Sequence, residues 1–422
     1  MRWKVEDTPE RAAFRAGFKS WLQEVLPDGW VDALERRDDA AFATARKGFN
    51  FLAWMGTIGS TGYAAPLWPR EYGGLSGEPW MQQIVREELA NHRLPTFGLN
   101  LLGVGLAGPT MIAHASDEQK LRYLPRILSG EEIWCQLFSE PGSGSDLASL
   151  STRAVRDGDE WIVNGQKVWT SIASIATFGM LLARTDPDVP KHEGLSYFIV
   201  DMHSPGIEIR PLRQITGSAD FNEVFFTDVR VPDLNRIGEA GEGWRYARTT
   251  LMNERVALSG LSIDAASLMG GPRRDPWEAF LSGVKDRTDP ILRQELARIY
   301  TAQEVKEITA FRASAARLAG QTPGAEGGVT KVCNAELNQH RSNVAMNAAG
   351  MTSIAWEAGV AGGLDSGGDG AARATAFLRT RANTIEGGTS EVLRNQIGER
   401  ILGLPREVEV DKGVSWAGTR RS

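Results

Sequence analysis

The sequence has few cysteines and histidines, and neither residue type forms a ligand pattern. Cys135 and Cys333 are the two cysteines among 422 residues, and no Cys-x-x-Cys pair occurs. This pattern argues against a disulfide framework and a zinc site, and it favours a reducing, cytoplasmic location. The five histidines also lack ligand spacing, so no metal site is expected.

The chain lacks a surplus of basic residues as well. It has 47 Lys and Arg against 53 Asp and Glu, a net charge of -6, which argues against a nucleic-acid partner. The N-terminus carries no apolar signal-peptide run. Residues 94–113 are uncharged and of membrane-spanning length, but two prolines and four glycines interrupt them. We expect a buried, broken helix pair there and no integral membrane segment.

Changes in hydrophobic pattern divide the chain, and its length favours two or three domains. The pattern predicts a helical domain (1–133), a small β domain (134–240), a second helical domain (241–405) and a loose tail (406–422). A capping box from Ser116 to Gln119 begins one helix, which should stop near Gly130. Asp157-Gly158 is typical of a hairpin turn.

The stretch "SEPGSGSD", residues 139–146, is suited to hold an anion. Its glycines let the backbone approach a ligand closely, and its serines supply hydroxyls. Exposed N–H groups in such turns bind phosphate oxygens. A plain surface turn is the alternative. The stretch matches neither the Rossmann fingerprint nor the P-loop.

The stretch "NGQKVWTS", residues 164–171, places a tryptophan and two hydroxyls at the end of a predicted strand. Trp169 could cover one edge of a planar cofactor, and Thr170 or Ser171 could donate a hydrogen bond to it. A core tryptophan is the alternative, since single tryptophans in β domains are commonly buried.

Four segments together resemble the acyl-CoA dehydrogenase family: "CQLFSEPGSGSDLASL", "VNGQKVWTS", "TLMNERV" and "TIEGGTSEVLRNQIGERILGLP". The resemblance covers the chain to about residue 405. It implies an α+β fold with an N-terminal helical domain, a central β domain and a C-terminal four-helix bundle. It also implies the FAD-dependent oxidation of an acyl-CoA to a trans-2-enoyl-CoA, with electrons passed to an electron-transfer flavoprotein.

The resemblance further implies which residues meet the cofactor and substrate. For FAD they are Gln136, Phe138, Ser139, Gly144, Ser145, Trp169, Thr170, Ser171, Thr389, Ser390 and Glu391. Trp169 would flank the flavin ring, and Ser171 would donate to N5, where the hydride arrives. The last three would begin a helix, whose free N–H groups suit an anion. Ser145, Arg255 and Gly388 would meet the acyl-CoA.

The family places its catalytic base at one of two positions. One lies immediately before the Gly-Thr of the C-terminal loop, where this chain has Gly387, so Glu386 is one residue too early. The other lies directly before an arginine on the first helix after the β domain, which matches Glu254 and Arg255. We therefore expect Glu254 to be the base, with Glu386 as the alternative.

The family's usual signals for a cofactor half-site shared between subunits are missing from "GGPRRDPWEAFLSGVKDRTDP" and "NAAGM". The assembly is therefore left open as a homotetramer or a heterotetramer with another dehydrogenase subunit. Two further alternatives remain: a subunit with a partial or non-catalytic site, and an acyl-CoA oxidase or monooxygenase on the same fold.

Small residues mark the segment that lines the acyl pocket in relatives. Gly98, Gly103, Gly105 and Gly108 follow one another there, and no bulky aromatic comes after Phe97. A roomy pocket would favour a long, branched or polycyclic acyl group, as in lipid or sterol side-chain breakdown. The alternative is that these glycines only let two helices pack closely.

Overall fold

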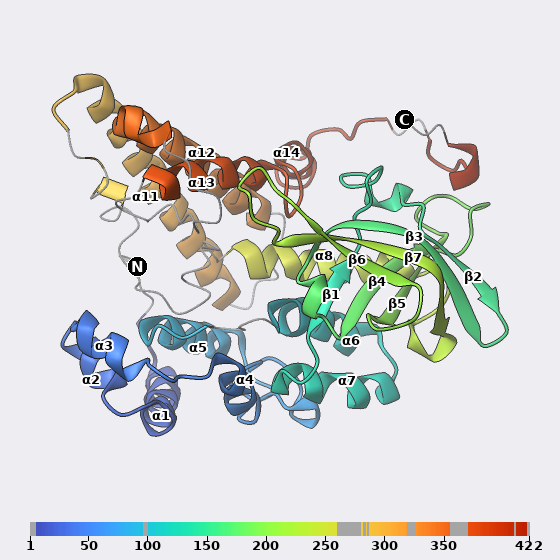
Figure 1. Cartoon of the computed structure of the whole chain (residues 1–422), viewed down its shortest axis with the longest axis horizontal. Helices are drawn as coiled ribbons and strands as arrows, with labels where there is room; N and C mark the ends of the chain where they lie inside the picture. Colours follow the sequence, from blue (N-terminus) through green and yellow to red (C-terminus); the bar gives the residue numbers. More distant parts are fainter. Residues whose placement is uncertain are drawn as a thin grey trace.

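The structure, a computed structural model, describes residues 6–95, 100–259, 280–281, 284, 287–318, 326–354, 370–408 and 411–419. Its first part is helical: α1 (Pro9–Val25), α2 (Trp30–Glu35), α3 (Asp39–Ala45), α4 (Phe51–Gly59), α5 (Pro79–Asn91), α6 (Gly108–His114) and α7 (Asp117–Ser129). The middle part is a sheet: β1 (Trp134–Leu137), β2 (Arg153–Asp157), β3 (Glu160–Ser171), β4 (Phe178–Arg184), β5 (Leu195–Asp201), β6 (Ile207–Leu212), β7 (Phe221–Pro232) and β8 (Arg236–Ile237). The last part is helical again: α8 (Gly243–Ser259), α11 (Pro290–Leu318), α12 (Glu326–Ala349), α13 (Gly370–Thr380) and α14 (Ser390–Arg400). The helix–sheet–helix order confirms the predicted architecture (Figure 1).

The helix cap, the helix end and the hairpin that the sequence predicted are present in the structure. The Ser116 hydroxyl accepts from the N–H of Gln119, and the Gln119 side chain accepts from the N–H of Ser116, so the capping box is present. Gly130 ends α7 in a left-handed conformation, with a φ of 76°. β2 and β3 pair antiparallel across the predicted turn, with Asp157 opposite Glu160.

The sheet runs in the order β6-β7-β3-β2-β4-β5-β8, and β1 pairs in parallel with β4. All seven residues of β4 are buried. Alternate side chains of this strand serve two cores, since Met180 and Leu182 belong to one cluster while Leu181 and Ala183 belong to the other. Burial on both faces explains why β4 is apolar from Phe178 to Ala183, without polar alternation, before it ends at Arg184.

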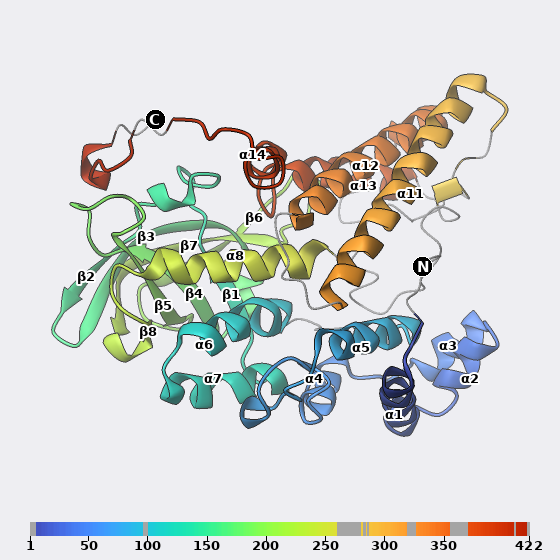
Figure 2. The same ribbon diagram turned by 180° about the vertical axis from the view of Figure 1, so that it is seen from behind.

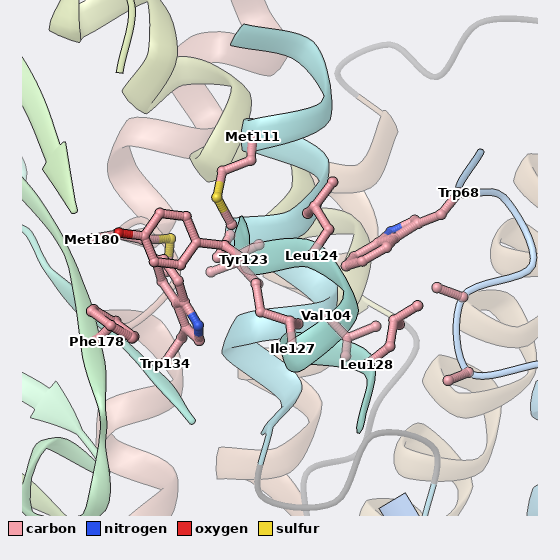
Figure 3. Packing of buried hydrophobic residues seen from close by; sticks show 14 of the residues in the cluster. Trp68, Val104, Met111, Tyr123, Leu124, Ile127, Leu128, Trp134, Phe178 and Met180 are labelled. Atoms are coloured by element: carbon pink, nitrogen blue, oxygen red, sulfur yellow. The ribbon is translucent and has the colours of Figure 1, made fainter. Parts of the chain in front are cut away.

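A large apolar cluster joins the first helices to the sheet. Figure 3 shows Trp134 and Phe178 of the sheet facing Tyr123 of α7. The Tyr123 ring meets both at 5.4 Å and 5.3 Å, edge to face. Aromatic pairs in this geometry add to the free energy of burial. The cluster therefore fixes β1, which carries Gln136, against the helical layer.

Helix α8 crosses between the sheet and the other helices (Figure 2), where it packs on α6, β5 and α12. Three buried hydroxyls hold it there. The Thr250 hydroxyl lies 2.9 Å from that of Thr110 on α6 and 3.1 Å from that of Tyr197 on β5. Because Glu254 follows Thr250 by one helical turn, this network fixes the position of Glu254.

The uncharged segment 94–113 contains, in its described part, a π-helical turn at Gly103–Ala107 followed by α6. Within the described ranges, no helix is long and apolar enough to cross a membrane. A Cβ added at Gly108 would lie 1.9 Å from the Trp68 ring, and one at Gly103 would lie 2.3 Å from Asn100. Close packing therefore explains Gly103 and Gly108, and neither supports a roomy pocket. Phe97 and Gly98 lie outside the described residues.

The prediction of a loose tail is wrong for residues 411–419. After α14 the chain reaches the far end of the sheet (Figure 1), and the Trp416 side chain is buried there. The tail is polar on average, but its single buried tryptophan anchors it, and an average composition does not reveal one such residue.

Candidate active site

The loop at residues 139–146 is fixed by an ion pair beneath it. The Lys167 ammonium on β3 is fully buried and donates to the carbonyl of Phe138 and to the carboxylate of Glu140, both at 2.9 Å. Glu140 also accepts from the backbone N–H groups of Ser151, at 2.6 Å, and Thr152, at 2.8 Å. Lys167 and Glu140 therefore fix the start of the loop and join it to the backbone at Ser151 and Thr152.

The charges of this pair stabilise each other against burial. Burial alone would raise the pKa of Glu140, but the Lys167 cation and the N–H donors outweigh it and hold that pKa below its usual value. Burial also lowers the pKa of Lys167, and Glu140 opposes that change. Such a pair is stable only while both partners are present.

The loop contains one buried side chain that shapes the turn and several exposed residues. The Ser143 hydroxyl is buried and donates to the carbonyl of Asp146 at 2.6 Å, so it shapes the turn. Gly142, Gly144 and Ser145 are exposed, and a Cβ added at either glycine would meet nothing within 4 Å. The outer surface of the loop is therefore exposed, and the binding of an anion there stays a prediction.

Two predicted cofactor residues at the start of the loop lie deeper. The Phe138 ring is buried edge to face against Tyr197, with centroids 5.8 Å apart, and only its backbone carbonyl takes part in the loop. The Ser139 carbonyl accepts from the N–H of Val168 at 2.9 Å, which joins the loop to β3. In this structure the backbone carbonyls of Phe138 and Ser139 join the start of the loop to β3.

Trp169 is held outward by an irregular backbone. The pairing of β3 with β7 shifts register between Lys167 and Thr170, and Trp169 has a φ of 60°. A left-handed tryptophan is strained, and such strain persists where the surrounding structure requires it. Its side chain is 58% exposed and touches Phe221 edge to face at 5.9 Å. The alternative of a core tryptophan is therefore wrong.

Next to it, Thr170 is buried, and its hydroxyl finds no hydrogen-bond partner among the described residues. The hydroxyl of Ser390, at the first residue of α14, is in the same situation. A buried polar group without a partner costs about 1–3 kcal/mol. Both hydroxyls belong to the predicted cofactor set, and both retain the capacity to bond a ligand group. Ser171 is half-buried at the end of β3.

The turn before α14 depends on two glycines. Gly387 and Gly388 have φ values of 64° and 94°, a region that disfavours residues with a side chain. Thr389 then caps the helix, accepting from the N–H of Val392 at 3.2 Å. Lys331 of α12 donates to the carbonyl of Gly388. The exposed Glu391 lies in the first turn, where its charge suits the helix dipole.

Glu386 is engaged in an ion pair of its own. Its two carboxylate oxygens accept from the two terminal nitrogens of Arg379, at 3.1 Å and 2.8 Å. The amide of Asn383 donates to the same carboxylate at 2.7 Å. A bidentate pair of this kind fixes both the charge and the orientation of a carboxylate. Glu386 therefore serves to brace the turn between α13 and α14.

Glu254 lies in a different environment. The side-chain amide of Gln136, on β1, donates to one of its carboxylate oxygens at 3.2 Å. The contact joins two residues 118 positions apart, one in the predicted cofactor segment and one at the predicted base. The side chain of Arg255, the predicted substrate contact, lies outside the described residues.

Sequence reasoning missed the contacts that support this site. Nothing in the local pattern linked Gln136 to Glu254, or Thr250 to Thr110 and Tyr197. One signal was available for Lys167, since it continues the inward-facing alternation of Trp161 and Val163 on β3. A lysine at a buried strand position requires an anionic partner, and Glu140 is that partner.

Comparison with known proteins gives one consistent result. The chain matches the acyl-CoA dehydrogenase N-terminal domain over residues 8–131, the middle domain over 135–229 and the C-terminal domain over 241–402. It is 37% identical to the acyl-CoA dehydrogenase IpdE1 of Mycobacterium tuberculosis, over 94% of this chain and 98% of that protein. It is 42% identical to the acyl-CoA dehydrogenase FadE34 of the same organism, but it spans only 46% of that longer protein.

Solved structures agree with the sequence matches. The Tcur3481-Tcur3483 steroid ACAD superposes with a TM-score of 0.72 and 30% identity, covering 96% of this chain and 100% of that one. The ChsE4-ChsE5 complex from Mycobacterium tuberculosis gives a TM-score of 0.70 and 29% identity, over 96% and 100% of the two chains.

Proposed function

Since this chain belongs to the acyl-CoA dehydrogenase family, we propose that it oxidises an acyl-CoA to the trans-2-enoyl-CoA, with Glu254 as the base that removes the α proton. One observation carries the proposal. The carboxylate of Glu254 meets the amide of Gln136 on β1, at the strand that leads directly into the fixed loop of residues 139–146. The predicted base and the predicted cofactor segment are therefore in direct contact.

Members of this family bind FAD, and the residues present here fit that cofactor. The open backbone of Gly142 and Gly144 suits a diphosphate, and the outward Trp169 suits the edge of a flat ring. The hydroxyls of Thr170 and Ser390, which have no hydrogen-bond partner among the described residues, offer hydrogen bonds. When bound, FAD supplies the acceptor for the hydride from the β carbon. Ser171, Thr389 and Glu391 complete the proposed contacts.

For the proton transfer, the protein must supply the Glu254 carboxylate in its ionised form and in a fixed orientation. A base must be ionised before it can accept a proton, and a hydrogen bond donated to a carboxylate favours the ionised form. Gln136 makes such a bond to Glu254 and fixes the direction of its side chain. Glu386 is less suited to the role, because Arg379 and Asn383 already occupy its oxygens.

For the substrate we propose a bulky acyl group, with a steroid-derived thioester as the first candidate. The support comes from a structural relative that is a steroid ACAD, at 30% identity over nearly the full chain. Gly103 and Gly108 do not support a roomy pocket, because close packing explains both. Arg255 and Gly388 remain proposed contacts of the thioester.

We expect purified protein to bind FAD and to lose its flavin absorbance under anaerobic conditions when an acyl-CoA is added.

A panel running from butyryl-CoA to a steroid side-chain acyl-CoA should give rising kcat/KM, because each buried methylene adds about 0.8 kcal/mol to the binding free energy. Preference for the four-carbon thioester would contradict the substrate proposal. Folded protein that takes up no FAD, even when FAD is supplied, would contradict the reaction itself. Slow reoxidation of the flavin in air would favour an electron-transfer flavoprotein over oxygen as acceptor.

We also propose that the chain assembles with a second, different dehydrogenase subunit. Apolar side chains stand exposed on the C-terminal helices and just after them: Ile291, Val305, Ile308, Ile401, Leu402 and Leu404. On α11, Tyr300 is exposed as well, while Leu296 and Ile299 are buried. Apolar groups in such number mark an interaction surface.

The ChsE4-ChsE5 complex supports a mixed assembly over four identical chains. Light scattering on the chain produced alone should show a smaller or unstable species with weak FAD retention. Production together with its partner subunit should give a stable complex that retains FAD. A homotetramer with a full complement of FAD would contradict the mixed assembly and leave the proposed reaction intact.

A further inference from the structure

The C-terminal segment 411–419, which we call the strap, is joined to the sheet domain through its backbone. The N–H of Trp416 donates to the carbonyl of Val189, and the N–H of Ala417 donates to that of Pro187, both at 2.8 Å. Ser415 forms a bridge with Pro190. The strap thus adds an extended edge to the connection between β4 and β5.

The strap also reaches the end of the loop that carries Ser145. The indole N–H of Trp416 donates to the carbonyl of Ser149 at 3.2 Å. The Trp416 ring lies 4.3 Å from the guanidinium carbon of Arg184. That guanidinium is buried and donates to the carbonyls of Ala148, at 2.5 Å, and Leu150, at 3.2 Å. Trp416 therefore covers the cation that gathers the backbone of residues 148–150.

A second contact joins the strap to the residue next to Ser145. The Lys191 ammonium lies 3.0 Å from the carboxylate of Asp146 and 3.0 Å from that of Asp411. Asp146 in turn accepts from the Ser149 hydroxyl at 2.5 Å. Lys191 therefore bridges the strap and the loop through two carboxylates.

From these contacts we propose that the strap is a positioning element that holds the loop of residues 139–146, together with residues 147–150 that follow it, in the conformation that receives a diphosphate. The inference deepens the proposed function and rests on it, because the loop is the segment proposed to meet FAD and the acyl-CoA. Both ligands carry a diphosphate, and the chemistry of the open glycine backbone suits either. The buried ion pair of Lys167 and Glu140 fixes the start of the loop, and the strap fixes its end.

The variant Trp416→Ala in the full-length, FAD-loaded protein tests this role. Loss of one desolvated cation–π contact should weaken ligand binding roughly five- to tenfold. One arm measures the rate of FAD release. The other compares KM for an acyl-CoA with KM for the same acyl group on pantetheine, which lacks the diphosphate. Faster FAD release assigns the loop to FAD, and a rise in KM for the CoA thioester alone assigns it to the substrate.

Three further variants separate positioning from general stability. Trp80→Ala removes another buried tryptophan beside an arginine, with the Arg11 guanidinium 5.9 Å from its ring, at a site remote in sequence from the loop. It should lower the melting temperature without changing FAD release or the KM ratio. Trp416→Phe, which keeps a ring over Arg184 but loses the indole N–H bond to Ser149, should show a smaller change than Trp416→Ala. Asp411→Asn, which keeps Trp416, should show the same changes at about two- to threefold.

Unchanged FAD release and an unchanged KM ratio in both Trp416→Ala and Asp411→Asn would overturn the inference. So would equal changes in Trp80→Ala, because they would reflect stability alone. Failure of the wild-type protein to bind FAD at all would instead count against the proposed function, so the two failures are distinguishable.

Discussion

Replacing Glu254 by glutamine should slow the bleaching of the flavin by acyl-CoA about a hundredfold or more, while FAD stays bound. Glutamine keeps the size of the side chain and can still contact Gln136, but it cannot accept the α proton. The measurement is the single-turnover rate of flavin reduction in a stopped-flow experiment without oxygen. The absorbance of bound FAD before mixing shows that the site has survived the substitution.

Glu386→Gln is the matched control, because it makes the same chemical change at the alternative base. It should lower the rate by less than about tenfold, since the native carboxylate is occupied by Arg379 and Asn383. A larger loss in Glu386→Gln than in Glu254→Gln would place the base at Glu386. Gln136→Leu adds a separate test: losing the donor to the Glu254 carboxylate should slow flavin reduction, because the direction of that side chain is then no longer fixed.

Replacing Lys167 by methionine should destabilise the protein by roughly 3–5 kcal/mol, the usual result of removing one member of a buried ion pair. The Glu140 carboxylate would keep its two backbone donors but lose its cation in a buried site. The free energy of unfolding in urea measures the change, and FAD should be released more readily because the start of the loop is freed.

The double variant Lys167→Met with Glu140→Gln tests the cause. Removing both charges should restore part of the lost stability, since no uncompensated charge is then buried. Arg230→Met on the neighbouring strand, which breaks an exposed pair with Asp157 and Glu160, should leave the unfolding midpoint nearly unchanged. Equal destabilisation by Arg230→Met and Lys167→Met would contradict the special role of the buried pair.

Several features were determined by the sequence alone because their causes are local. The capping box of Ser116 and Gln119, the end of α7 at Gly130 and the hairpin at Asp157-Gly158 each depend on residues within a few positions of one another. The order of helical, β and helical segments follows from hydrophobic periodicity, which is also a local property. The motif segments likewise identified the family before any contact was known.

Other features were decided only by the tertiary structure, because their causes join residues far apart in the chain. Sequence spacing favoured Glu254 over Glu386, but only the fold shows Gln136 at one carboxylate and Arg379 at the other. The glycine at 108 allowed two interpretations until Trp68 was found against it.

The same reason explains the tail and the loop. The polar C-terminus was expected to be loose, but its Trp416 contacts Arg184, more than two hundred residues earlier. The partner of Lys167 is likewise Glu140, 27 positions away in the chain. Burial of a charge or a ring depends on what the rest of the chain brings to it, and no short window of sequence contains that information.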